Sequence, residues 1–254
     1  IARMNLFLHG VEDFTVVNDD TLAKPAFIKN GKIQKFDIVL ANPPYSIKQW
    51  NREGFASDLY GRNIWGTPPQ GRADYAFFQH IVCSMKKETG RCAILFPHGI
   101  LFRDEERGMR KKLVKSDVLE CVIGLGPNLF FNASMEACIV ICNMNKSTER
   151  RNKVLFIDAK DEVTRKNAQS NLEKEHINKI VKAFDKFKTI ATFSVLVDNE
   201  TIINNNSELR IALYIHDEKM IPKDKLDITD CLFDWTNQAK KAKVEVDNLI
   251  NIIG

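Results

Sequence analysis

The chain has 254 residues, of which 44% are hydrophobic and 28% charged, a composition typical of a globular protein with a sizeable core. Its formal net charge of +4, from 37 Lys and Arg against 33 Asp and Glu, permits contact with a polyanion without requiring it. No apolar stretch reaches the roughly 18 residues of a membrane helix, and we expect no signal peptide. The sequence therefore predicts no membrane partner, and the cysteine pattern described next predicts a cytoplasmic protein.

The six cysteines include no C-x-x-C pair, and most lie in apolar runs. This pattern predicts reduced cysteines in the core rather than disulfides, and we expect no metal site. The first residue is Ile rather than Met, and we expect the chain to begin inside a longer one.

The first part of the chain leads to an unusual tetrapeptide. Residues 1–10 have the pattern of the end of an amphipathic helix, which Gly10 stops, and a short strand is predicted over residues 14–18, before Asp19 and Asp20. The apolar run at residues 36–41 predicts a buried strand. The tetrapeptide at residues 42–45 follows at the strand's carboxyl edge, where open α/β sheets bind ligands.

The tetrapeptide is Asn42-Pro43-Pro44-Tyr45, and its residue types suit chemistry on a planar nitrogen. The Asn42 side-chain oxygen and the Pro43 carbonyl can accept hydrogen bonds from a conjugated NH2 group while it attacks an electrophile. The two prolines fix the backbone in advance. The Tyr45 ring can stack on a planar substrate. The alternative is a strand that simply ends in a Pro-Pro turn.

A polar stretch without periodicity follows over residues 46–72, and it contains several Arg and aromatic residues. Loops of this length in compact domains are usually functional or disordered. Arg interleaved with aromatic rings is typical of a surface for splayed nucleotides, and an ordinary solvated lid is the other interpretation.

The middle of the chain alternates helical and strand patterns, which predicts an α/β, doubly wound sheet. The predicted helices cover residues 73–87 and 104–115, the second as a charged surface helix, and the predicted strands cover residues 92–96, 118–125, 137–143 and 154–158. No helix separates the strands at 118–125 and 137–143, which suggests an antiparallel hairpin at the sheet edge. Between them lie Phe130 and Phe131; at least one ring is expected in the core, and both are candidates to contact substrate.

Beyond residue 158 the chain becomes rich in charged helical patterns. Residues 172–188 predict an amphipathic helix, and residues 232–253 predict a terminal one. The terminal helix has two equal interpretations, packing on its own domain or contact with another subunit.

Taken together, the tetrapeptide and several other segments resemble one known family. The sequence resembles the modification (M) subunit of type I DNA restriction-modification systems over residues 1 to about 215. The matching segments, in family order and spacing, are residues 2–10, 20–22, 40–45, 73–77, 97–103 and 127–130, with later support at 156–158 and 176–177. The resemblance implies a Rossmann-like methyltransferase sheet and S-adenosylmethionine-dependent, site-specific methylation of adenine N6 in DNA.

The resemblance also implies roles for particular residues and partners. Asn42, Pro43, Pro44 and Tyr45 match the family's catalytic motif, and Asn42 also lies at the cofactor. Asp20 matches an acidic residue near the cofactor's adenine, with Asp19 as the alternative. The expected partners are DNA, a specificity subunit and a restriction subunit in a multi-subunit complex.

The sequence departs from the family in one large respect. The family's Gly-rich cofactor loop and the acidic residue after it belong upstream of residue 1. In the family's sheet the first two strands lie between the third and fourth, so we expect an unfilled slot between the strands at residues 14 and 36. The isolated chain is therefore expected to be inactive and to bind S-adenosylmethionine weakly.

The resemblance divides the chain into three parts. Residues 1–160 form the catalytic part of the methyltransferase domain, residues 161–230 an α+β extension, and residues 231–254 an amphipathic helix available for subunit contact. Two other functions stay open: methylation of another planar nitrogen, in ribosomal RNA guanine or protein glutamine, and a donor-deficient fragment that serves only as an assembly module.

Overall fold

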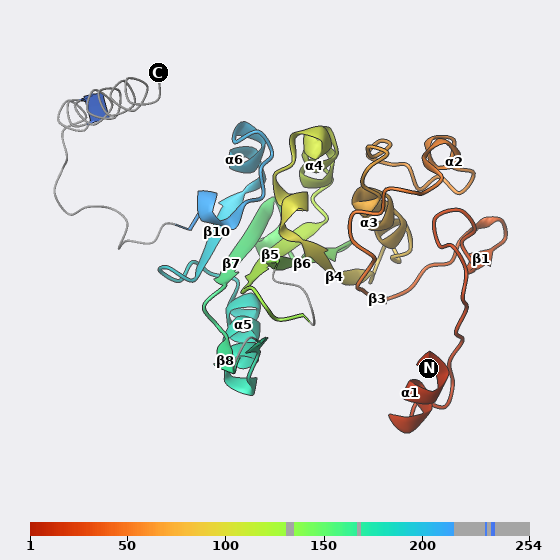
Figure 1. The fold of residues 1–254 in the computed structure, drawn as a ribbon. Helices are drawn as coiled ribbons and strands as arrows, with labels where there is room; N and C mark the ends of the chain where they lie inside the picture. Colours follow the sequence, from red (N-terminus) through yellow and green to blue (C-terminus); the bar gives the residue numbers. More distant parts are fainter. Residues whose placement is uncertain (131–134, 167–168, 216–231, 233–234, 237–254) are drawn as a thin grey trace, which may run out of the picture. The chain divides into compact units, whose positions relative to one another are not determined.

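A computed structural model describes residues 1–130, 135–166 and 169–215, together with residues 232, 235 and 236 (Figure 1). The chain divides into two compact units, residues 1–215 and 216–254. The predicted terminal helix over 232–253 lies almost wholly outside the described residues. The three-part functional division at residues 160 and 230 stays a prediction.

The N-terminal segment is partly as predicted. Helix α1 (Ala2–Leu8) ends before Gly10, whose φ of 74° is a left-handed conformation that glycine adopts readily. The predicted strand at residues 14–18 is wrong, because that segment pairs with no neighbouring strand in the described structure. A short hairpin of β1 (Ile28–Lys29) and β2 (Lys32–Ile33) follows it.

A six-stranded mixed sheet forms the centre of the first unit, in the order β10-β7-β5-β6-β4-β3. Four strands run parallel, whereas β6 and β10 are antiparallel to their neighbours. The strands are β3 (Ile38–Ala41), β4 (Arg91–Pro97), β5 (Leu119–Leu125), β6 (Ala137–Asn143), β7 (Lys153–Ala159) and β10 (Ser194–Asp198). The predicted β5–β6 hairpin is confirmed, but its predicted position is wrong: β7 and β10 extend the sheet beyond β5, so the hairpin is central.

Helices cover both faces of this sheet (Figure 1). On one face, α3 (Asp74–Cys83), α4 (Arg107–Lys115) and α6 (Asn199–Asn204) pack on the larger apolar cluster. On the other face, α5 (Lys174–Lys186) packs on β5 and β7. The periodic patterns predicted α3, α4 and α5. Although α4 is charged, it buries Met109, Leu113 and Val114, so it is not only a surface helix.

The smaller elements connect these layers. They are α2 (Arg52–Ala56), the hairpin of β8 (Thr164–Lys166) and β9 (Gln169–Asn171), and the 3-10 turns η1 (His98–Leu101), η2 (Asp104–Glu106), η3 (Thr148–Arg150) and η4 (Ile211–Leu213). Four of the five described cysteines are buried free thiols, as predicted for core residues, and Cys83 is half-buried. Among the helices described, none has both the length and the apolar character to cross a bilayer.

Strand β3 differs from its prediction as a buried strand. Ile38 and Leu40 are 61% and 77% exposed, and Val39 and Ala41 are half-buried. The reason is position, because in the described part of the chain β3 is the outermost strand of the sheet and pairs with β4 alone. The strand that leads into the tetrapeptide is therefore open on its outer edge and on one face.

Candidate active site

The predicted catalytic tetrapeptide lies where the fold places ligands. Residues 42–45 follow β3, and β3 is parallel to β4, so the turn lies at the carboxyl edge of the parallel strands. Asn42 is exposed, Pro43 is buried and Tyr45 is half-buried. The buried proline anchors the turn, which leaves the Asn42 amide accessible.

Tyr45 and Asn42 contact each other directly. The Tyr45 hydroxyl donates a hydrogen bond to Asn42 Oδ1 at 3.0 Å. Burial raises the pKa of the Tyr45 phenol, with smaller contributions from Cys138 and Asp74, so the hydroxyl keeps its proton at neutral pH. Because an amide oxygen has two lone pairs, Oδ1 can accept this hydrogen bond and one from a substrate amine together.

A cavity of about 480 Å³ lies beside Asn42 on the α5 face of the sheet. Asn42 and Phe130 both line it, which brings together two of the predicted site residues from different elements. Its lining is otherwise apolar and contains no carboxylate: Leu40, Ala41, Ala93, Leu95, Leu125, Ile139 and Leu172. Phe131 lies outside the described residues.

Neither residue of the acidic pair, Asp19 and Asp20, lines the cavity beside Asn42. Asp20 Oδ1 accepts the backbone N–H groups of Leu22 and Ala23, which orders the turn after it. Asp19 pairs with Lys24 at 3.6 Å and lines a cavity of about 90 Å³. No described contact links either carboxylate to Asn42, so their role toward the cofactor stays a prediction.

The segment 46–72 is more ordered than either prediction for it. Arg62 is only 2% exposed; it pairs with Asp58 at 2.6 Å and donates to the carbonyls of Thr21 and Leu22. Trp65 is buried against α3. These two residues are therefore part of the core rather than a nucleotide-binding surface. Sequence reasoning missed that Arg62 holds the residues directly after Asp20.

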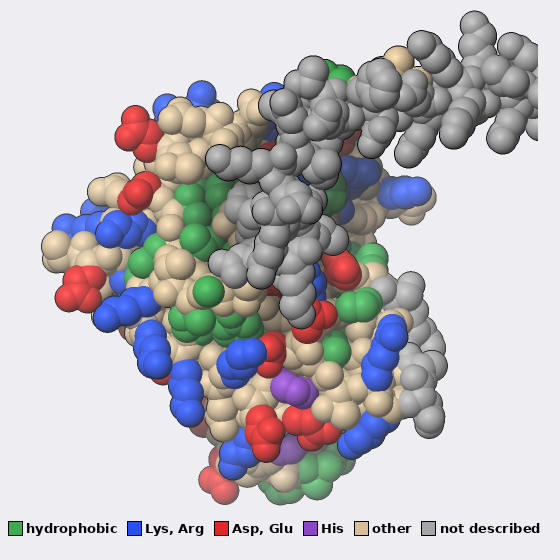
Figure 2. All heavy atoms as spheres, turned by 90° about the vertical axis from the view of Figure 1, so that its left-hand side faces the viewer, with side chains coloured by type: hydrophobic (Ala, Val, Ile, Leu, Met, Phe, Trp, Pro, Cys, Tyr) green, Lys and Arg blue, Asp and Glu red, His purple; other side chains and the backbone are tan. Residues whose placement is uncertain are grey.

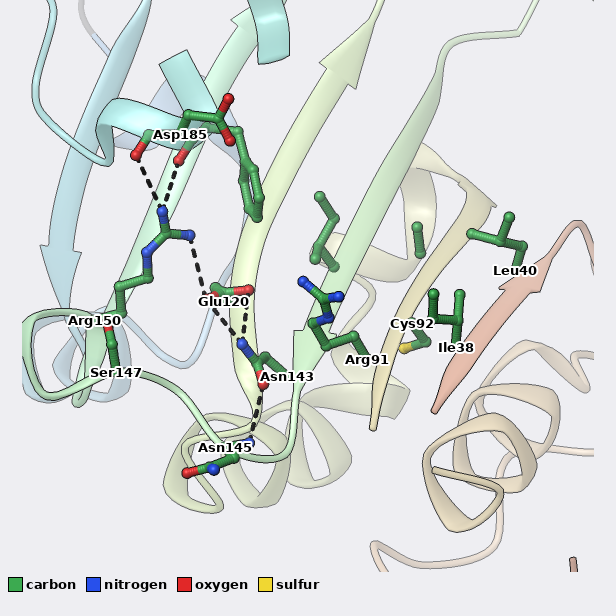
Figure 3. Close-up of a pocket in the computed structure, with 13 residues that line it drawn as sticks. Ile38, Leu40, Arg91, Cys92, Glu120, Asn143, Asn145, Ser147, Arg150 and Asp185 are labelled. Carbon is green, nitrogen blue, oxygen red and sulfur yellow. Dashed lines mark hydrogen bonds and ion pairs between the residues drawn. The ribbon is translucent and has the colours of Figure 1, made fainter. Parts of the chain in front are cut away.

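A second hollow, of about 490 Å³, lies at the other end of the same sheet face (Figure 3). Its polar rim links Asn143, Glu120 and Arg150: Asn143 Nδ2 donates to Glu120 Oε1 at 3.3 Å, and Arg150 lies 3.4 Å from the same oxygen. These residues lie at the amino-terminal end of the parallel strands, away from the edge that carries Asn42. The Glu120 carboxylate and the Arg150 guanidinium therefore pair with each other, and none of the predicted site residues lines this hollow.

The surface charge is mixed rather than concentrated. On the face drawn in Figure 2, Lys and Arg side chains are interspersed with Asp and Glu and with apolar side chains. The net charge of +4 is therefore not gathered into one basic patch on that face.

The fold and the turn define a class of protein: a mixed sheet in which β6 inserts antiparallel between parallel strands, flanked by helices, is the Rossmann-like methyltransferase fold. A solved methyltransferase subunit of a type I restriction-modification system from Streptococcus thermophilus has this fold, with a TM-score of 0.77 and 35% identity. The match covers 85% of this chain and 45% of that one.

Sequence comparison gives the family. The family model described as N-6 DNA Methylase matches residues 1–222, and this chain belongs to that family. It is 32% identical to the methylase subunit of the type I restriction enzyme MjaVII from Methanocaldococcus jannaschii and 31% identical to that of MpnII from Mycoplasma pneumoniae. These matches cover 100% and 90% of this chain but only 44% and 43% of the relatives, so the chain spans less than half their length.

Proposed function

We propose that this chain supplies the catalytic turn of an S-adenosylmethionine-dependent DNA methyltransferase that modifies adenine N6, within the modification subunit of a type I restriction-modification system. The observation that carries the proposal is the Asn42–Tyr45 turn at the carboxyl edge of β3, opening onto a cavity shared with Phe130. Membership of the N-6 DNA methylase family supports this reading over methylation of RNA guanine or protein glutamine.

The side chains divide the work. A flipped adenine stacks on Tyr45 or Phe130, and its amine donates hydrogen bonds to Asn42 Oδ1 and to the Pro43 carbonyl. As the nitrogen attacks, positive charge grows on it, and these oxygens stabilise that charge. When bound, S-adenosylmethionine supplies an electrophilic methyl group. Positioning and charge stabilisation are then sufficient for a direct displacement, with no covalent enzyme intermediate.

The donor site is only partly formed by the described residues. The cavity beside Asn42 has room for a ligand, and Asn42 would contact it, but the lining offers no carboxylate for ribose hydroxyls. Asp20, or Asp19, would contact the donor's adenine, although neither residue lines the cavity beside Asn42 and Asp19 lines a separate hollow. We propose that the full donor site includes a Gly-rich turn and an acidic residue on strands that pair with the open edge of β3.

The same reasoning extends to partners. We propose that a longer methylase subunit containing this chain acts on DNA in a complex with a specificity subunit, and with a restriction subunit when it cleaves. The isolated chain would then be an assembly-competent piece without donor binding, which the open edge of β3 favours.

The test of the proposed function is Asn42→Ala in the methylase assembled with its specificity subunit. Losing an acceptor for the charge that develops on the amine costs about 3 kcal/mol, which is a rate loss of about 100-fold or more. Donor affinity should stay nearly intact. Single-turnover methylation and donor titration measure both quantities, and activity within about tenfold of the unaltered enzyme would exclude the role given to Asn42.

A further inference from the structure

A buried ion pair lies directly beneath the catalytic turn. Asp74, the first residue of α3, is 1% exposed, and its Oδ1 accepts the backbone N–H of Ser46 at 2.7 Å. Its other oxygen, Oδ2, accepts from the Arg103 guanidinium at 2.6 Å and from the Ser46 hydroxyl at 3.4 Å. One carboxylate therefore joins three segments: the turn after β3, the start of α3 and the loop after β4.

Arg103 is itself held in place from two sides. Arg110, which is fully buried in α4, donates to the backbone carbonyl of Arg103 at 2.7 Å. Gly99 leaves the space that the guanidinium occupies, because a Cβ at that position would lie 2.7 Å from Arg103 Nε. The guanidinium also reaches the Ser46 hydroxyl at 3.4 Å. Its orientation is thus set by the fold before any ligand binds.

Ser46 is the link between this pair and the tetrapeptide. It follows Tyr45 directly and has a φ of 49°, a left-handed conformation that is uncommon for residues other than glycine. The turn also sits on the outermost strand, which has a neighbour on one side only. The hydrogen bond from Ser46 to Asp74 provides a fixed support that β3 cannot provide alone.

We propose that Asp74 and Arg103 are positioning residues, which hold the Asn42–Tyr45 turn in its reactive geometry through Ser46. This proposal rests on the methyl-transfer function proposed above. The pair sets the position of the Asn42 side chain relative to the reacting amine. It does not affect the binding of donor or DNA. Sequence matches at residues 73–77 and 97–103 thereby gain a physical role at the site.

The kinetic test uses Asp74→Asn, Arg103→Met and the double variant in the assembled methylase. At saturating donor and DNA, each single change should slow single-turnover methylation about 30-fold, because small displacements of reacting groups cost large factors in rate. The KM values should stay within about threefold. The double variant should be no slower than the slower single variant, since both changes break one unit.

Asp117→Asn is the matched control. Asp117 also joins a buried cation to a loop amide: it accepts from Lys146 Nζ at 2.6 Å and from the Asn152 N–H at 2.9 Å. It precedes β5, at the opposite end of the parallel strands from Asn42. We expect Asp117→Asn, like Asp74→Asn and Arg103→Met, to lower the melting temperature. Unlike them, it should keep the methylation rate within about twofold of the unaltered enzyme.

A second measurement needs no activity. Hydrogen exchange of the Ser46 amide in the 254-residue chain should become about tenfold faster in Asp74→Ala, while amides of β5 keep their protection. Unchanged exchange would overturn the proposal. The proposal would also be overturned if Asp74→Asn and Arg103→Met methylated within about twofold of the unaltered enzyme. The same holds if the rate losses of the two single variants multiplied in the double variant. Activity retained in Asn42→Ala would instead reject the proposed function, and the exchange result would still decide whether the pair holds the turn.

Discussion

Strands β3 and β5 are both apolar runs, yet they have opposite surroundings. All seven residues of β5 are buried, because β6 and β7 flank it and helices cover both faces. In β3, Ile38 and Leu40 are more than half exposed, because β4 is its one neighbour. The same kind of sequence therefore forms the centre of the core in one place and an uncovered edge in another.

The difference shows how the turn at residues 42–45, which we propose to be catalytic, is held in place. β5 is held by packing on every side, whereas β3 carries the turn at the least covered position of the sheet. Buried polar contacts beneath the turn, rather than strand packing, hold it. An open apolar edge beside a catalytic turn is also what a strand from another part of a longer methylase would cover.

The largest expected effect on stability contrasts two leucines. Leu155 in β7 is fully buried beside β5, so Leu155→Ala should lower the free energy of unfolding by about 2–5 kcal/mol through the cavity it leaves. Leu40→Ala, at a side chain 77% exposed, should change it by less than about 0.5 kcal/mol. Urea titration of the 254-residue chain measures both. Equal losses would mean that β3 is covered in solution.

The open edge also predicts weak donor binding. The cavity beside Asn42 lacks a carboxylate in its lining, and each missing hydrogen bond to a charged group costs about 1.5–3 kcal/mol. Two such losses move a micromolar site toward millimolar. Calorimetric titration of residues 1–254 with S-adenosylmethionine should therefore give little heat. The matched control is a longer methylase chain that carries the Gly-rich loop, and a low-micromolar constant for the 254-residue chain would contradict the prediction.

The pH dependence of stability should differ between two buried glutamates, Glu106 and Glu120. Burial raises the pKa of the Glu106 carboxyl from 4.5 to about 7, and neither of its oxygens has a hydrogen-bond partner among the described residues. The nearest described cation, Arg103, lies 3.5 Å away. Because the folded state holds this proton more tightly, the contribution of Glu106 to stability should be greatest below pH 4.5. It should fall as the pH rises to 7, by at most about 3 kcal/mol.

Glu106→Gln should accordingly melt at a higher temperature than the unaltered chain at pH 8, with a smaller difference at pH 5. The control is Glu120→Gln, whose carboxylate pairs with Arg150 and accepts from Asn143. That variant should be less stable at pH 8, because it loses both partners. Thermal unfolding at the two pH values separates the cases, and a destabilised Glu106→Gln at pH 8 would contradict the prediction.

The smallest expected effect concerns the Tyr45 hydroxyl. Tyr45→Phe removes one neutral hydrogen bond to Asn42, worth about 1 kcal/mol, and should slow methylation by about fivefold at most. Tyr45→Ala also removes the stacking ring, worth about 1–3 kcal/mol. Single-turnover rates of the assembled methylase compare the two variants. Equal losses would show that the hydroxyl, rather than the ring, is the important part.

Local patterns predicted the elements because each depends on a few neighbouring residues. Local apolar runs predicted four strands, β4, β5, β6 and β7, and helical periodicity predicted α5. The central position of the β5–β6 hairpin and the exposure of β3 depend on which strands become neighbours, and no local pattern encodes that.

The same limit applies to the candidate site. The residue types of the Asn42–Tyr45 turn indicated its chemistry, and Phe130 does line the cavity beside it. Asp74 could not be assigned in this way, because its contact with Ser46 joins residues 28 positions apart. For Arg62, the Arg and aromatic pattern suggested a surface, whereas the fold buries the guanidinium among backbone carbonyls.

The antiparallel direction of β6 determines where the connection between β5 and β6 lies relative to residues 42–45. β5 ends and β6 begins at the edge of the sheet that carries residues 42–45, and Phe130, in the connection between these two strands, lines the cavity beside Asn42. Changes in the length of this connection leave the strand pairing intact, since both anchoring strands lie inside the core. Insertions or deletions in this connection can therefore change the lining of the cavity beside Asn42 without changing β3, which leads into residues 42–45.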